Sequence, residues 1–257
     1  MRFTKMHGIG NDYVYIDGFQ EDVQNPNELA VAMSKPHFGV GSDGLILILP
    51  SDVADFKMRM FNKDGSEGTM CGNGARCVGR FVYEHGLTDR TSFTLETGGG
   101  IRQIRLHLVG QEVRTVTVDM GTPVRLQIDD EKTFVSTGNK NVVLFLNEDP
   151  FDYAAFNRLG PEYCEQYDAN IEFVQVLSEN LLKMRVFERG SGETLACGSG
   201  ACAALVAAYT KNLTGRSATV TLRGGDLQIA WRAEDGHVIM TGPVETVFEG
   251  DWKRSIE

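Results

Sequence analysis

Two short stretches of the sequence combine a cysteine with small residues in the same order. Residues 71–75 read Cys-Gly-Asn-Gly-Ala, and residues 197–201 read Cys-Gly-Ser-Gly-Ala. A cysteine can take up or release a proton, and the glycines beside it leave backbone N–H groups accessible to a ligand. Where such a turn opens a helix, the N–H groups and the helix dipole favour a bound anion. Each stretch is therefore a candidate carboxylate site with an acid or base, Cys71 or Cys197, beside it.

The two cysteine motifs belong to a longer internal repeat. Residues 57–75 align with residues 183–201 without a gap, and identical Lys, Met, Arg, Phe and Glu residues precede the motif in both copies. A second pair of similar stretches places Gly-Asn ahead of an apolar run, at Asn11 and at Asn139. The repeat is thus the size of a domain, and it indicates two halves of similar fold.

Each half must place its cysteine at the start of a helix. A predicted strand, 57–61 or 183–187, leads through a polar Gly-rich loop to the cysteine, and the apolar segment that follows predicts a helix ending near Gly86 or Asn212. Short β-rich segments make up most of the remaining chain. The predicted fold is α/β (α+β): two pseudo-symmetric domains, each a curved, mostly antiparallel or mixed, barrel-like β-sheet around a central helix.

The predicted domain boundary lies at residues 119–124, where turn residues interrupt a strand. The N-terminal half-site domain is expected to cover residues 1–118, and the C-terminal segment 247–257 is expected to return to it. The C-terminal half-site domain is expected to cover residues 119–246.

Composition and charge exclude several classes of partner. The formal net charge of −10 disfavours nucleic acids and anionic membrane surfaces, which would repel the protein. No apolar run reaches membrane-spanning length, and we expect a cytoplasmic protein. Five cysteines in a chain of this length predict free thiols. A small molecule is the expected partner, and a homodimer is compatible with the sequence.

The duplication suggests how two cysteines could act together. Halves related by a pseudo-twofold axis would bring the two helix starts face to face across a cleft, with one substrate carboxylate shared between them. One thiolate would remove the α-proton from one face of the carbon while the opposing thiol protonates the other. The helix N-termini would stabilise the developing negative charge, and we expect them to lower the pKa of both thiols.

Other interpretations of the cysteines are weaker. A cysteine near a helix start is, on its own, more often a small buried side chain than a catalyst, but two at equivalent places in a repeat favour catalysis. A zinc site is disfavoured because Cys71/Cys77 and Cys197/Cys202 are spaced more widely than usual zinc ligands. We expect Cys77 and Cys202 in the helix cores, Cys164 to be structural, and no metal.

Four stretches resemble the diaminopimelate epimerase family: KMHGIGND, FGVGSDGL, FNKDGSEGTMCGNGARC and ERGSGETLACGSGACAA. The resemblance runs from Lys5 to about Gly250. It implies an isomerase that needs no cofactor and converts LL-diaminopimelate to meso-diaminopimelate, a precursor of lysine and peptidoglycan. It also implies two pseudo-symmetric domains with Cys71 and Cys197 as the acid/base pair.

The resemblance also implies roles for further residues. Glu188 would meet the substrate ammonium and partner the second thiol, with which it should share a proton. Arg189 would bind a distal carboxylate, to which a guanidinium can donate two parallel hydrogen bonds. Taken singly, an asparagine is more often a turn or cap residue and Arg189 a solvated charge. The implied side-chain ligands are Asn11, Asn62, Asn139, Asn170 and Arg189, and the implied carboxylate cradle is Gly72, Asn73, Gly198 and Ser199.

One departure from the family pattern leaves the substrate open. Where the family usually has Gly-Asn-Pro-His, this chain has Lys140 and Asn141 at the last two positions. An asparagine cannot replace the histidine that the resemblance associates with the first thiol. The chain is therefore a diaminopimelate epimerase with a modified half-site, or a relative that racemises another amino acid such as histidine.

Two further alternatives come from other classes. A non-enzymatic carboxylate-binding or redox-sensing protein could use the same two turns, although binding alone needs no sulfur. A pyridoxal-phosphate racemase is disfavoured because the sequence has no phosphate-binding loop linked to a plausible Schiff-base lysine.

Overall fold

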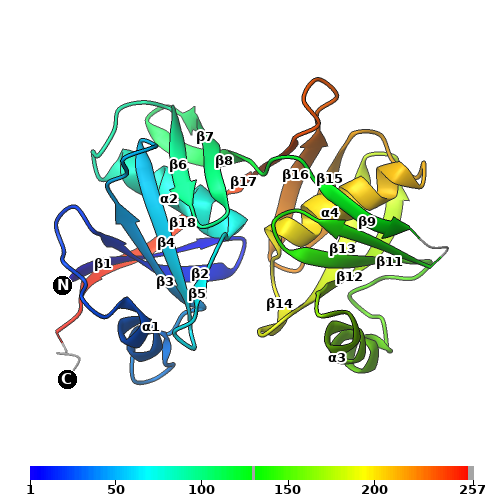
Figure 1. Ribbon diagram of the computed structural model, residues 1–257, viewed down its shortest axis with the longest axis horizontal. Coiled ribbons are helices and arrows are strands. Elements are labelled where there is room, and N and C mark those ends of the chain that lie inside the picture. The colour runs from blue at the N-terminus through cyan, green and yellow to red at the C-terminus, as the bar shows by residue number, and fades with distance from the viewer. Residues whose placement is uncertain (129–130, 254–257) are drawn as a thin grey trace. The chain divides into compact units, whose positions relative to one another are not determined.

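The computed structural model describes residues 1–128 and 131–253, and the chain separates into two compact units. Unit 1 consists of Met1–Val118 together with the segment that begins at Pro243, and unit 2 consists of Asp119–Gly242. The return to unit 1 therefore begins ahead of the expected residue 247. Both units mix helices with β-strands, so the predicted α/β (α+β) class is confirmed (Figure 1).

Unit 1 is built on one mixed β-sheet. Its strands are β1 (Arg2–Gly8), β2 (Asn11–Asp17), β3 (Gly44–Leu49), β4 (Phe56–Asn62), β5 (Glu67–Gly68), β6 (Ser92–Thr97), β7 (Gly100–Val109), β8 (Glu112–Asp119) and β18 (Glu245–Asp251). They pair in the order β18, β1, β2, β3, β4, β6, β7, β8, and the short β5 pairs with β4. The β2–β3 and β4–β6 pairs are parallel, and the others are antiparallel.

Unit 2 repeats this arrangement strand for strand. Its strands are β9 (Val124–Ile128), β10 (Lys132–Ser136), β11 (Lys140–Leu146), β12 (Asn170–Ser178), β13 (Leu181–Glu188), β14 (Gly192–Thr194), β15 (Ser217–Leu222), β16 (Gly225–Trp231) and β17 (Val238–Pro243). The order is β9, β10, β11, β12, β13, β15, β16, β17, with β14 on β13. The parallel pairs are β11–β12 and β13–β15, at the same positions as in unit 1. The duplication therefore includes the topology of the sheet.

Each unit has two helices, inserted at equivalent points of the repeat. The helices are α1 (Pro26–Ser34) and α2 (Gly72–Glu84) in unit 1, and α3 (Phe156–Tyr167) and α4 (Gly198–Thr210) in unit 2. α2 contacts β1, β2 and β7, whereas α4 contacts β10, β11, β12, β13, β15 and β16. α2 and α4 are thus the central helices that the sequence predicts.

The central helices are buried along most of their length. All residues of 72–82 and 198–208 are buried, which suits the small and apolar side chains of α4. α2 packs so closely on the sheet that a Cβ at Gly79 would lie 3.0 Å from side-chain atoms of Ile104 and Val116. Both helices end where the chain turns left-handed, at Gly86 (φ 70°) and Asn212 (φ 58°), so the predicted ends are confirmed.

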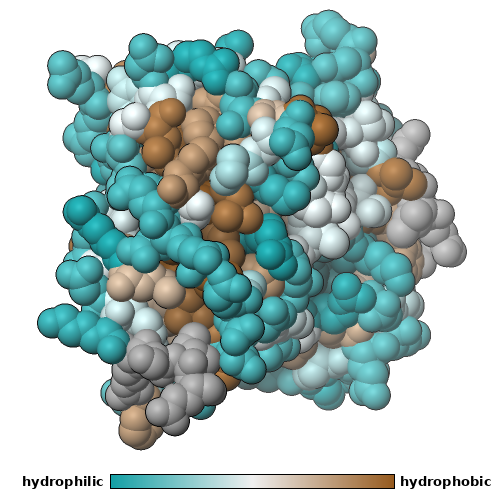
Figure 2. Space-filling model, turned by 60° about the vertical axis from the view of Figure 1, so that its left-hand side comes forward, coloured by the Kyte–Doolittle hydropathy of each residue, from teal (hydrophilic) through white to brown (hydrophobic). Residues whose placement is uncertain are grey.

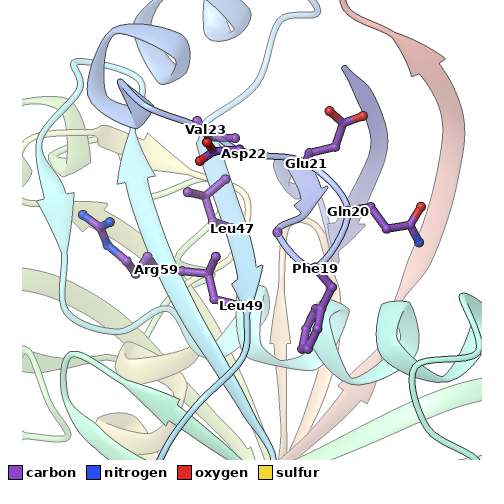
Figure 3. A pocket seen from close by; sticks show the side chains of 9 residues that line it. Phe19, Gln20, Glu21, Asp22, Val23, Leu47, Leu49 and Arg59 are labelled. Carbon is purple, nitrogen blue, oxygen red and sulfur yellow. The ribbon is translucent and has the colours of Figure 1, made fainter.

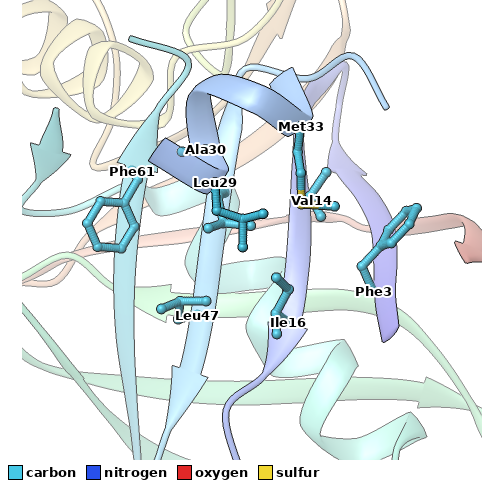
Figure 4. Packing of buried hydrophobic residues seen from close by; sticks show 9 residues of the cluster. Phe3, Val14, Ile16, Leu29, Ala30, Met33, Leu47 and Phe61 are labelled. Carbon is cyan, nitrogen blue, oxygen red and sulfur yellow. The ribbon is translucent and has the colours of Figure 1, made fainter. Parts of the chain in front are cut away.

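One hydrophobic cluster of unit 1 lies between α1 and the sheet. Leu29 and Met33 of α1 pack on Val14 and Ile16 of β2 and on Leu47 of β3 (Figure 4). Each of these side chains is almost fully buried, and such burial stabilises the fold by about 1.5–3 kcal/mol per side chain. This packing fixes the strands that carry the first cysteine site.

A repeated ion pair holds the strand ahead of each cysteine. Arg59 contacts Glu67 at 2.7 and 2.9 Å, and Arg185 contacts Glu193 at 2.8 and 3.0 Å, each through two parallel hydrogen bonds. Both pairs join the last strand before the loop to the short strand inside it. The matching Arg and Glu residues of the repeat therefore brace the hairpin that leads to each cysteine.

On the face shown in Figure 2, hydrophilic side chains surround smaller hydrophobic patches. No helix in the part of the chain that the structure describes is long and apolar enough to span a bilayer.

Candidate active site

Both cysteines of the repeated motif occupy the N-cap of a central helix. Cys71 has φ −131° and ψ 113°, Cys197 has φ −130° and ψ 106°, and each precedes the first helical residue. The Cys71 sulfur accepts a hydrogen bond from the N–H of Gly74 at 3.2 Å, and the Cys197 sulfur accepts one from Gly200 at 3.4 Å. The two thiols are thus held in the same way at the positive end of a helix.

The second glycine of each motif is required for packing. A Cβ at Gly74 would lie 2.6 Å from Cδ1 of Ile46, and a Cβ at Gly200 would lie 2.7 Å from Oε1 of Glu172. Both distances are far below van der Waals contact, so a larger residue would force the Ile46 or Glu172 side chain, or the helix start, to move.

In unit 1, an asparagine network surrounds Cys71. The Cys71 thiol lies 3.4 Å from Oδ1 of Asn11, which also accepts a hydrogen bond from Nδ2 of Asn73 at 3.1 Å. Nδ2 of Asn11 donates to Asp43 at 2.8 Å. Burial and the charge of Asp12 raise the pKa of the Asp43 carboxyl. The structure therefore brings the implied residues Asn11 and Asn73 to the first thiol, with Asp43 behind them.

Asn62 has a different environment. It ends β4, where its Nδ2 donates to Oγ of Ser66 at 3.0 Å and its backbone N–H donates to the Ser66 carbonyl at 2.8 Å. These contacts make Asn62 a turn residue, which is a common structural role of asparagine. It remains in the neighbourhood of the first site because the backbone N–H of Lys63 donates to the carbonyl of Asp43.

In unit 2, Cys197 lies in a buried polar network. The thiol lies 3.5 Å from the Ser199 hydroxyl and 3.9 Å from Nδ2 of Asn170. Asn170 also donates to Oδ1 of Asn141 at 3.3 Å and accepts from the backbone N–H of Arg189 at 3.0 Å. Asn170 thus connects the Cys197 thiol with the side chain of Asn141 and with the backbone of Arg189.

Asn141 is a structural residue of this network. It is 1% exposed, and its Nδ2 donates to the carbonyl of Asn139 at 2.8 Å and to the Val135 carbonyl and the Thr137 hydroxyl at 3.3 Å each. Thr137 in turn donates to the Ser199 carbonyl at 2.9 Å, and Asn139 lies 3.5 Å from the Ser199 hydroxyl. Asn141 therefore ties the 137–139 loop to the helix start.

Arg189 lies at the edge of the second site and is already paired. Its guanidinium contacts Asp168 at 2.9 Å, and Lys140 contacts the other oxygen of Asp168 at 3.1 Å. The side chains are half exposed or more, so the cluster is accessible to a ligand. Asp168 was not singled out from the sequence; in the structure it closes α3 in the left-handed conformation (φ 49°).

Carboxyl groups set the electrostatics around Cys197. Burial raises the pKa of the Cys197 thiol well above its usual value, and the charges of Glu188 and Glu172 raise it further. Hydrogen bonds from Ser199 and Gly200 lower it by less. The expectation that the helix N-terminus lowers the pKa of this thiol is therefore wrong, because desolvation and two acids outweigh the helix.

The two acids differ in their surroundings. Glu188 is half-buried at the end of β13 and accepts a hydrogen bond from the Thr194 hydroxyl. Glu172 lies in the middle of β12 and is fully buried. Glu172 is not among the residues predicted from the sequence, although a single acid between the apolar residues Ile171 and Phe173 was a usable signal.

The other cysteines lie in the core. Cys77 and Cys202 are 0% exposed within the central helices, as predicted, and burial raises the pKa of Cys77 to about 12. Cys164 of α3 packs in an apolar cluster with Phe156 and Phe173. All five cysteines are free thiols.

Two other features lie apart from the cysteine sites. Within the described ranges, one group has ligand atoms close enough to hold a metal ion, Asp119, Asp235 and His237, but Arg232 pairs with both carboxylates and occupies the cluster with its own charge. A surface pocket of unit 1 is lined by residues 18–23 and parts of β3 and β4, and none of the implied site residues lines it (Figure 3).

Comparison with known proteins decides the family. The sequence profile of diaminopimelate epimerase matches residues 3–126 and 133–247. The chain belongs to the diaminopimelate epimerase family. A diaminopimelate epimerase of Methanococcus maripaludis is 48% identical over 98% of this chain and 99% of its own length. One of Acetivibrio thermocellus is 46% identical over 98% of each chain.

Solved structures share the fold at much lower identity. A predicted epimerase from Pseudomonas aeruginosa has a TM-score of 0.78, 17% identity and 99% coverage of both chains. A hydroxyproline epimerase from Agrobacterium vitis has a TM-score of 0.74 and 15% identity, covering 97% of this chain and 91% of its own. At such identities the likeness shows the two-domain β-rich fold alone.

Proposed function

We propose that the protein epimerises LL-diaminopimelate to meso-diaminopimelate without pyridoxal phosphate, with Cys71 and Cys197 as its two acid/base groups. One observation carries the proposal: two equivalent helices each begin with a cysteine N-cap whose sulfur faces polar site residues. Family relatives with the same name, similar along nearly the whole chain, support the substrate.

The reaction needs a base and an acid on opposite faces of one carbon. One cysteine, as thiolate, takes the α-proton, and the electron pair of the broken C–H bond moves into the substrate carboxylate. The other cysteine, as thiol, gives its proton to the opposite face of the carbon, which inverts the centre. The two sulfurs exchange protonation states in each turnover. Both then return to the starting state by proton exchange with solvent.

The helix starts supply the electrostatic part of the catalysis. The first N–H groups of a helix have no carbonyl partner within it, so those of α2 and α4 suit a carboxylate. Negative charge grows on this carboxylate as the α-proton leaves, and donors that are already oriented stabilise it without reorganisation. This is the proposed role of Gly72, Asn73, Gly198 and Ser199.

The remaining site residues are proposed to orient the substrate. Arg189 exchanges its single hydrogen bond with Asp168 for the distal carboxylate, to which a guanidinium can donate two parallel hydrogen bonds. Glu188 is proposed to receive the substrate ammonium near Cys197. The asparagines Asn11, Asn139 and Asn170 offer both donors and acceptors to the substrate backbone, and Asn62 completes the set at the end of β4.

The raised pKa of Cys197 favours the protonated form of this thiol at the start of the reaction. Cys197 enters the reaction as a thiol and therefore as the proton donor. Its conversion to a thiolate in the reverse direction needs the substrate ammonium beside Glu188, because a cation favours the nearby anion. We place the enzyme in the cytoplasm, where a reducing environment keeps both thiols free.

Serine variants of the cysteines test the proposal. Cys71→Ser and Cys197→Ser should each lower turnover of LL-diaminopimelate by about 10²–10⁴-fold, the usual contribution of general acid–base catalysis, while calorimetry still detects binding. Cys164→Ser is the matched control, because this thiol lies in the core of unit 2, and it should keep the wild-type rate.

The same assay separates the alternatives. If folded, reduced protein fails to convert LL-diaminopimelate but racemises another amino acid such as histidine, the chain is a relative with a different substrate. If no amino acid is turned over and the serine variants lose only an oxidant response, the protein is a binding or redox-sensing module.

A further inference from the structure

The two cysteine half-sites differ at one equivalent position behind the helix start. In β3 this position is Ile46, paired with Tyr15 of β2, and in β12 it is Glu172, paired with Val143 of β11. Each side chain packs against the second glycine of its motif, at the distances of 2.6 and 2.7 Å from a built Cβ given above. The duplication therefore places a carboxyl behind Cys197 where it places a methyl group behind Cys71.

The Glu172 carboxyl has an unusual environment. It is 0% exposed, and in the described part of the chain neither of its oxygens has a hydrogen-bond partner. An ionised carboxylate without a partner is very costly in such a place, whereas a protonated carboxyl is tolerated. Burial accordingly raises the pKa of Glu172 well above its ordinary value, and the charge of Glu188 adds to the rise. The nearby backbone N–H groups of Glu172 and Val142 oppose the rise, although neither has the geometry of a hydrogen bond to the carboxyl.

The titratable groups that face Glu172 come from three elements. Glu188 ends the neighbouring strand β13, Cys197 caps α4, and Cys164 lies on α3. Glu188 is the most exposed of them, so a negative charge there costs the least desolvation. A second charge on Cys197 or Glu172 then meets repulsion in a buried space, so both groups keep their protons at neutral pH. As the pH rises, the carboxyl of Glu172, intrinsically the stronger acid, ionises before the thiol, and its charge opposes the ionisation of Cys197.

We propose that Glu172 is a positioning residue for the second thiol: its carboxyl, packed against the first turn of α4, makes the Cys197 half-site the proton-donating half of the resting enzyme. Glu172 does not touch the substrate in this proposal and acts through Cys197. The first half-site has Ile46 in the equivalent place, and its acid, Asp43, accepts a hydrogen bond from Asn11 instead. The inference rests on the proposed function, because it assigns a starting state to one of the two proposed catalytic thiols.

Thiol titration tests the inference without any substrate. Reduced protein is alkylated with iodoacetamide for short times over a range of pH, and mass spectrometry of peptides gives the rate at Cys197 and at Cys71 separately. Glu172→Gln keeps the shape but cannot ionise, and Glu172→Ile copies the first half-site. Both should move the pH midpoint of Cys197 alkylation down by about one unit, which is about tenfold faster alkylation below the midpoint.

Controls separate this effect from a general loss of structure or charge. The midpoint of Cys71 in the same samples should not move, and Glu179→Gln, the same change at an exposed site of unit 2, should leave both midpoints unchanged. Far-UV circular dichroism of each variant confirms folding.

The two variants also distinguish charge from packing. An equal shift in the Gln and Ile variants supports the inference, because the two residues share only their neutrality. An unchanged Cys197 midpoint in Glu172→Gln overturns it, as does a shift of Cys71 equal to that of Cys197. The alkylation needs no turnover, so a failure of the proposed epimerase activity would show in the kinetic assay and leave this result readable.

Discussion

Replacing Asn141 with leucine tests whether the polar network of unit 2 positions the second thiol. Leucine has a similar size but no donor or acceptor, so the change removes the contacts of Nδ2 with three oxygens and the contact of Oδ1 with Asn170. Nδ2 has two protons to donate, so about three net hydrogen bonds are lost. At about 1 kcal/mol each, the free energy of unfolding of unit 2 should fall by about 3 kcal/mol.

This loss is large enough to measure by calorimetry. A change of 1 kcal/mol shifts the Tm of a unit of this size by about 4 °C, so the unit 2 transition should move down by roughly 12 °C. Asn157→Leu, an exposed change on α3, is the matched control and should shift it little. Turnover should fall as well, because Asn170 loses one of the contacts that hold it beside Cys197. A variant with unchanged Tm and unchanged turnover would refute the positioning role.

Three further predictions follow from the same sites. Glu172 holds its proton in the folded state and releases it in the unfolded state, so stability should fall as pH rises above about 4.3, with a slope of up to about 1.4 kcal/mol per unit for one proton. Urea titrations should show this slope in wild type and not in Glu172→Gln; equal slopes would contradict it. Gly200→Ala should destabilise unit 2 by about 1–3 kcal/mol through its contact with Glu172, and a neutral effect in thermal melts would oppose the packing argument. Arg189→Lys should raise KM more than it lowers kcat, since Lys lacks the planar fork, and a pure kcat effect in steady-state kinetics would argue against substrate binding there.

The sequence predicted the parts of the fold that repeat. The gapless alignment located both central helices, and the small residues after Cys71 and Cys197 marked their starts. Gly86 and Asn212 marked their ends, since glycine and asparagine favour the left-handed conformation that closes a helix. These features are local in the chain, which is why a pattern of a few residues sufficed.

Features that depend on distant segments could not be predicted in the same way. The raised pKa of Cys197 comes from burial and from Glu172 and Glu188, which lie on neighbouring strands of the folded sheet. Asn141 was identified as a departure from the family pattern, but its burial and its bond to Asn170 depend on the parallel pairing of β11 and β12. The sequence thus indicated which residue types matter at the second site, and the fold shows how they are connected.

Epimerisation of LL-diaminopimelate in D₂O tests the central claim of two opposed cysteines most directly. Reduced enzyme is mixed with pure LL isomer, and mass spectrometry follows α-deuterium in substrate and product during the first part of the reaction. With two different bases, the meso product should carry one solvent deuterium from the donor thiol while the remaining LL isomer stays almost unlabelled. Equal early labelling of both isomers would indicate a single base that serves both faces, and would contradict the account.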